Sequence, residues 1–196
     1  MIEDDETPRH ISIAIMYDRA IRSQILFEAI ALESVLDSII AWLFCADEGK
    51  HPLLFSLIFG DGQISFSKKI VILRKLIRQI YPDLNNEFGW LPNRLDRIRM
   101  LRNKFAHAEG VLPDNPPPPE RRSGATLRYF KDGKRIEEFI SKDYVDDVIA
   151  ESRYLQITAT MLQVVVSDRA TGCVHDDQLN GLRAAAALLK KRITTK

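Results

Sequence analysis

The sequence predicts a mainly α-helical protein, a helical bundle with a β-hairpin inserted after its central helix. Two observations carry this prediction. Apolar residues recur every three to four positions through most of the 196 residues, which is the period of one helix face. Late in the chain, Asp132-Gly133 separates two short runs rich in β-branched and aromatic residues, a pattern typical of a hairpin. The whole chain, 1–196, is expected to form a single domain.

The first 80 residues predict three helices. An acidic tail over 1–10 should precede one long helix over 14–46. A short helix over 53–59 and a third helix over 65–80 should follow. The charge of the third helix is carried by five basic residues, Lys68, Lys69, Arg74, Lys75 and Arg78.

The second half of the first helix, residues 25–46, is apolar on nearly every side. Three carboxylates interrupt it: Glu28, Glu33 and Asp37. Because a membrane span would have to bury these charges in lipid, the segment is interpreted as a helix buried in a bundle or in a subunit interface.

The central helix should begin near Pro92 and stop at Gly110, a residue typical of a helix C-terminus. One face is apolar, with Leu95, Ile98, Leu101 and Phe105. Another side is polar, with Asp96, Arg99, Asn103 and His107. His107 then lies in the last turn, where the negative end of the helix dipole favours a protonated imidazole.

Residues 110–140 are interpreted as an insertion, a Pro-rich loop followed by the hairpin. Strands are expected over 125–131 and 134–140. Ser141 should cap a helix that runs to about Arg169. A final helix should begin at Asp176 or Asp177, after a break at Thr171-Gly172.

Charge is unevenly distributed. Residues 63–135 contain sixteen Lys or Arg and seven Asp or Glu, whereas the remainder contains twelve and twenty. A basic surface that includes the central helix favours a nucleic-acid or nucleotide partner, although a solvated helical face is the common alternative.

Cys45 and Cys173 lack a partner spacing for zinc or a redox pair, and no cluster of His with Cys or carboxylates has ligand spacing. We therefore expect no metal and no cofactor. No basic leader segment is visible, so a cytoplasmic location is expected, without membrane attachment.

The stretch Arg102-Asn103-x-x-Ala106-His107 resembles the Arg-x4-His signature of HEPN domains, in which a polar residue usually follows the arginine. The run from Leu54 to Asp83 is also similar to the HEPN-like mannitol operon repressor family, whose members are thought to be regulators. The likeness covers residues 15–110. It implies a HEPN-like helical bundle, commonly dimeric, and for many members a metal-independent ribonuclease found in toxin–antitoxin pairs and antiviral defence.

The resemblance implies cleavage of single-stranded RNA by attack of a ribose 2′-OH on the adjacent phosphate. His107 would move protons, Arg102 would stabilise the phosphorane, and Asn103 would orient His107 or bind phosphate. Arg99 and Lys104 are candidates for substrate contact. The expected partners are RNA, a second copy of the chain, and an antitoxin or regulatory protein.

Two other interpretations remain open: a catalytically silent HEPN-like regulator that binds a protein, nucleotide or nucleic acid, and a purely dimeric interaction module. At the level of residues, Arg102 can instead form an ordinary ion pair with Glu28, Glu33 or Asp37. His107 can simply be a favourable residue at a helix end.

Five helical steps turn the chain by about 500°, so Arg102 and His107 point about 140° apart. One helix cannot easily aim both at one phosphate. A twofold dimer that brings two central helices together predicts a site shared between subunits.

Overall fold

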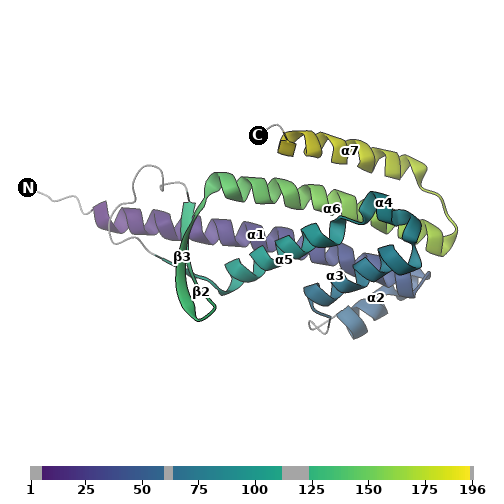
Figure 1. Ribbon diagram of the computed structural model, residues 1–196, viewed down its shortest axis with the longest axis horizontal. Coiled ribbons are helices and arrows are strands. Elements are labelled where there is room, and N and C mark those ends of the chain that lie inside the picture. Colours follow the sequence, from purple (N-terminus) through teal and green to yellow (C-terminus); the bar gives the residue numbers. More distant parts are fainter. Residues whose placement is uncertain (1–5, 60–63, 112–123, 195–196) are drawn as a thin grey trace, which may run out of the picture. The chain divides into compact units, whose positions relative to one another are not determined.

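The computed structural model describes residues 6–59, 64–111 and 124–194. It is mainly helical with a small antiparallel sheet, which confirms the predicted class. Four of the described helices are long: α1 (Glu6–Phe44), α5 (Leu91–His107), α6 (Lys142–Thr171) and α7 (Asp176–Thr194). Figure 1 shows these helices and the hairpin.

The chain divides into two compact units, and α1, α5 and α6 contribute residues to both. The first unit comprises residues 1–27 and 100–149. The second comprises residues 28–99 and 150–196. The candidate residues Arg102, Asn103 and His107 belong to the first unit.

The sheet of the first unit contains β1 (Glu109–Gly110), β2 (Gly124–Lys131) and β3 (Lys134–Ser141), in that order and antiparallel. The predicted hairpin is therefore confirmed. Its turn residues, Asp132 and Gly133, have φ angles of 52° and 74°. Because both values are positive, as in the turns that match the twist of a hairpin, an Asp-Gly pair fits this position.

The core of the first unit joins α1, the end of α5, the hairpin and the start of α6. Its buried side chains come from all of these elements: Ile21, Ile25, Phe105, Ala108, Ala125, Leu127, Ile140, Val145 and Ile149. Ser141 accepts a hydrogen bond from the Tyr144 amide over 3.2 Å. The predicted N-cap of α6 is confirmed.

The second unit also contains α7 and the short helices α2 (His51–Leu54), α3 (Phe66–Lys75) and α4 (Asn85–Phe88). Two π-type segments, Phe55–Phe59 and Leu76–Ile80, extend α2 and α3. The described part of the unit also contains two 3-10 segments, Glu48–Lys50 and Pro82–Leu84. The helices expected over 53–59 and 65–80 thus form.

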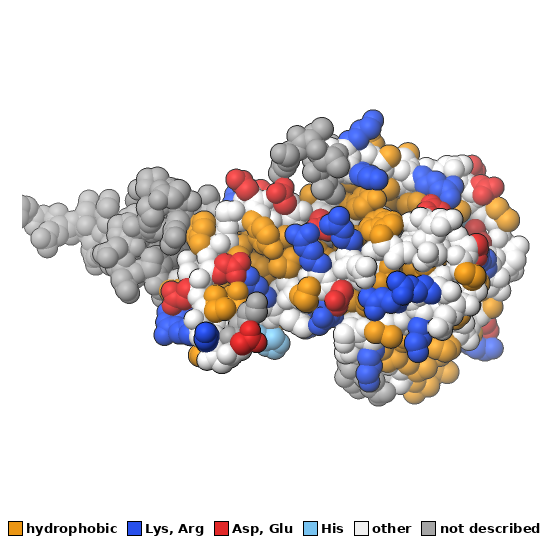
Figure 2. Space-filling model, in the orientation of Figure 1, with side chains coloured by type: hydrophobic (Ala, Val, Ile, Leu, Met, Phe, Trp, Pro, Cys, Tyr) orange, Lys and Arg blue, Asp and Glu red, His pale blue; other side chains and the backbone are white. Residues whose placement is uncertain are grey.

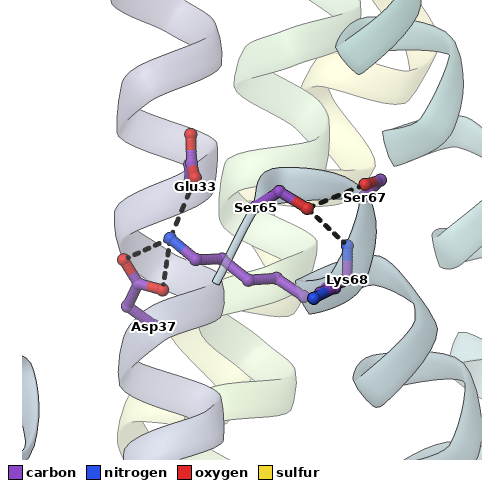
Figure 3. Close-up of polar contacts among 6 residues, drawn as sticks. Glu33, Asp37, Ser65, Ser67 and Lys68 are labelled. Carbon is purple, nitrogen blue, oxygen red and sulfur yellow. Dashed lines mark hydrogen bonds and ion pairs between the residues drawn. The ribbon is translucent and has the colours of Figure 1, made fainter. Parts of the chain in front are cut away.

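An ion-pair cluster holds α3 against α1 (Figure 3). The Lys69 ammonium lies 2.9 Å from Glu33 Oε1 and 2.8 Å from Asp37 Oδ1, and its side chain is only 4% exposed. Burial raises the pKa of Asp37 above its ordinary value, despite the bond from Lys69. Lys69 was expected to carry part of the charge of its helix, and the structure buries that charge; two carboxylates 36 and 32 residues away make the burial possible.

Two expectations about where helices begin and end differ from the structure. α1 begins at Glu6, within the stretch expected to fray. Gly110 lies in β1 instead of ending α5, and a Cβ at this position would approach Asp18 Oδ2 to 2.8 Å. A close approach by Asp18 therefore accounts for this glycine. Gly172, with φ of 73°, follows α6 as predicted.

The Pro-rich stretch of 113–119 lies outside the described residues, as do residues 60–63 between the second and third predicted helices. None of the described helices contains an apolar stretch long enough to cross a membrane.

Candidate functional site

The last two turns of α5 carry Arg102, Asn103 and His107, and His107 lies in the last turn, as predicted. Phe105, which is 1% exposed, packs into the core of the first unit and fixes the rotation of these turns. Arg102 and Asn103 are half-buried, whereas His107 is exposed. The His107 imidazole is therefore open to solvent, whereas the Arg102 side chain is partly covered by the protein.

The Arg102 guanidinium is bonded to its sequence neighbour. Its Nη1 donates a hydrogen bond to Asn103 Oδ1 over 3.1 Å. Among the described residues, no carboxylate forms a salt bridge with Arg102. Since a guanidinium carries five N–H groups, most of its donors remain for a ligand such as phosphate.

The three carboxylates considered as ion-pair partners of Arg102 are bonded to other residues. Glu28 accepts a hydrogen bond from Gln156 over 2.7 Å and pairs with Arg153 at 3.4 Å. Glu33 and Asp37 both pair with Lys69. The contacts of these side chains therefore do not support the ion-pair interpretation of Arg102.

The His107 side chain forms no hydrogen bond within the described ranges, and the residue is exposed. Both ring nitrogens are therefore open to solvent in this part of the structure, and each can exchange a proton with a ligand. Because α5 remains helical through His107, the angular separation of about 140° from Arg102 also holds. The two side chains leave the helix in different directions.

Arg22 was not identified from the sequence, yet it holds the end of α5. Its Nη1 donates hydrogen bonds to the backbone carbonyls of Phe105, over 2.8 Å, and of Ala108. Its Nε lies 2.9 and 2.8 Å from the two carboxylate oxygens of Asp18. Carbonyls at a helix C-terminus lack partners within the helix, so Arg22 caps the turn that carries His107.

The two residues predicted to contact substrate are engaged within the protein. Arg99 Nε lies 2.7 Å from Asp96 Oδ1. Lys104 pairs with Glu138 and lies 4.9 Å from the centroid of the Tyr129 ring. These contacts do not place either residue beside Arg102 or His107.

Lys104 of α5 and Glu138 and Tyr129 of the hairpin form one cluster. Within it, Tyr129 Oη donates a hydrogen bond to Glu138 Oε2 over 2.7 Å. This bond raises the pKa of Tyr129, which burial and the charge of Glu138 raise further. Burial opposes ionisation of Glu138, but the bonds from Lys104 and Tyr129 outweigh it and lower the pKa of Glu138. The cluster therefore attaches the hairpin to α5.

No three His, Cys, Asp or Glu side chains lie close enough to hold a metal ion within the described part of the chain. Cys45 is half-buried and Cys173 is exposed, and both are free thiols. The groups that remain for chemistry at the end of α5 are a guanidinium, an amide and an imidazole.

Comparisons with protein-family models, curated proteins and solved structures found no match to this chain. Membership of the HEPN class stays a prediction from the α5 residues and the segment before them.

Proposed function

We propose that this chain is a metal-independent endoribonuclease of the HEPN type that cleaves single-stranded RNA. The observation that supports it most is the exposed His107 at the end of α5, five residues after a guanidinium that forms no salt bridge with a described carboxylate. Transesterification of RNA needs no nucleophile from the protein, because the 2′-OH belongs to the substrate.

In the proposed reaction the ribose 2′ oxygen forms a bond to the adjacent phosphorus, and the bond from phosphorus to the 5′ oxygen breaks. The proton of the 2′-OH passes to a base, and the leaving 5′ oxygen receives a proton. His107 takes part in these transfers, which are typically worth about 10²–10⁴-fold in rate. Arg102 stabilises the negative charge of the phosphorane, and Asn103 holds the Arg102 guanidinium.

The test is digestion of a panel of single-stranded RNAs in the presence of EDTA. The expected products carry 2′,3′-cyclic phosphate or 3′-phosphate ends, and DNA of the same sequence stays uncut. His107→Ala and Arg102→Ala should each lower the rate by about 100-fold or more.

Two matched variants control for general damage. His175→Ala removes another exposed histidine, and Arg97→Ala removes an exposed arginine from the same helix. Both should cleave like wild type. Equal inactivity of wild type and His107→Ala across the panel would reject the nuclease and leave the regulator interpretation.

A further inference from the structure

The outward face of the hairpin carries an unusual combination of side chains. Side chains alternate along a strand, so Ala125, Leu127 and Tyr129 point to the core side of β2. Phe130 points to the opposite side and is 75% exposed. Phe130 stands directly opposite Arg135, and Arg128 directly opposite Glu137. Figure 2 shows hydrophobic, basic and acidic side chains mixed over the region where Figure 1 draws the hairpin.

Two guanidinium groups on this face share one carboxylate oxygen. Arg128 Nη2 lies 2.9 Å and Arg135 Nη2 lies 3.0 Å from Glu137 Oε1. The Arg128 guanidinium, and then that of Arg135, lowers the pKa of Glu137, which is therefore ionised at neutral pH. The carboxylate holds the two arginines side by side, and it competes with any other anion for their remaining donors.

The hairpin is tied to the candidate site by backbone pairing. Glu109, two residues after His107, pairs with Arg128, and Gly110 pairs with Leu127. The Val111 amide donates a hydrogen bond to the Thr126 carbonyl over 2.9 Å. The strand that carries Arg128 and Phe130 is thus the direct neighbour of the chain that leaves the His107 turn.

We infer that the outward face of the hairpin binds single-stranded RNA, an inference that rests on the proposed function. Phe130 stacks on a nucleobase, Arg128 and Arg135 contact backbone phosphates, and Glu137 is displaced by those phosphates. An aromatic ring beside basic groups is the combination that recognises unpaired bases. A lipid surface fits less well, because stable membrane attachment needs more than one weak anchor.

Binding is measured with a labelled single-stranded oligoribonucleotide and a His107→Ala background that prevents cleavage. Phe130→Ala and Phe130→Leu should each weaken binding by about tenfold, because neither retains a ring for stacking. Phe130→Trp should bind at least as well, and the added indole fluorescence should be quenched by the bases. Phe130 is exposed, so thermal melting should not change.

Glu137→Gln tests the phosphate contacts through a change that should strengthen RNA binding instead of weakening it. It keeps an oxygen that can accept bonds from both arginines but removes the competing charge, so binding should strengthen several-fold. Phe44→Ala, at another exposed phenylalanine (64%), is the matched control and should bind normally. Wild-type affinity in Phe130→Ala, or no gain in Glu137→Gln, would overturn the assignment. So would Phe130-dependent binding to phosphatidylserine vesicles with RNA binding unchanged.

The experiment separates this inference from the proposed function. Wild type that cleaves RNA while the Phe130 variants bind normally rejects the hairpin site alone. Wild type that never cleaves, combined with RNA binding that depends on Phe130, rejects the nuclease and retains the hairpin site.

Discussion

At the scale of residues, the candidate site is organised by a side chain that the sequence did not single out. The signature supplied Arg102, Asn103 and His107, since their spacing alone is enough to recognise them. Arg22 lies 83 residues before Phe105, whose carbonyl it caps. Helical periodicity assigns Arg22 to a side of α1 but does not identify its partner in another element.

The first prediction at this scale is that Arg22→Gln frays the end of α5. A glutamine side chain is too short to reach both carbonyls, and Asp18 loses its partner. We expect the free energy of unfolding to fall by about 1.5–3 kcal/mol, the usual range for hydrogen bonds to charged groups. RNA cleavage, measured where both proteins are folded, should fall as well.

Arg19→Gln is the control, because Arg19 is exposed on the same helix. Urea unfolding should give the control a stability within about 0.5 kcal/mol of wild type. If the two variants are equally stable, Arg22 does not stabilise the end of α5.

At the scale of elements, local signals in the sequence predicted most of the secondary structure. Asp132-Gly133 predicted the hairpin, and Ser141 the start of α6, because turns and caps depend on adjacent residues. The strand β1 was missed, since two residues carry no periodicity and depend on a partner strand. The burial of Lys69 was not predicted for the same reason: it is decided by carboxylates on a distant stretch of α1.

The prediction at this scale concerns the Lys69 cluster. Lys69→Met leaves Glu33 and Asp37 without their partner, and we expect a loss of about 3–5 kcal/mol in stability at neutral pH. Without the ammonium the pKa of Asp37 should rise further. A carboxyl with a raised folded-state pKa contributes stability below its unfolded pKa, and this contribution is lost as the pH rises through the folded-state pKa. The defect should therefore shrink on acidification.

Urea unfolding of Lys69→Met at several pH values measures this effect. Lys68→Met, at the exposed neighbouring residue, is the matched control and should be almost neutral. Adding Asp37→Asn to Lys69→Met should restore part of the stability. A loss that is independent of pH would show that the cluster is not held by charge.

At the scale of the whole molecule, the direction of the two side chains on α5 suggests that the site needs a second copy. Exposed apolar side chains on α1 offer one surface for such a dimer. Met16 and Phe27 are 69% and 68% exposed. They are eleven residues apart, which is close to three helical turns, so they lie on the same side of the helix.

We therefore predict complementation between two inactive variants. Chains carrying Arg102→Ala are mixed with chains carrying His107→Ala, and differently tagged heterodimers are isolated. Each heterodimer retains one working site out of two, so isolated heterodimers should recover roughly half of the wild-type cleavage rate, and the unsorted mixture roughly a quarter. A verified heterodimer without cleavage would reject the shared arrangement, and an active monomer would reject sharing altogether.

The short connection between α5 and β1 limits which insertions and deletions this chain can tolerate. Only Ala108 separates the helix from the strand, and that alanine is buried. Inserting one residue there would exchange the two faces of β1 and move Gly110 away from the Asp18 carboxylate. Deleting one residue would move β1 and the strand paired with it closer to the end of α5. Homologous chains should therefore keep the number of residues between the histidine and the strand constant, even where the residues themselves differ.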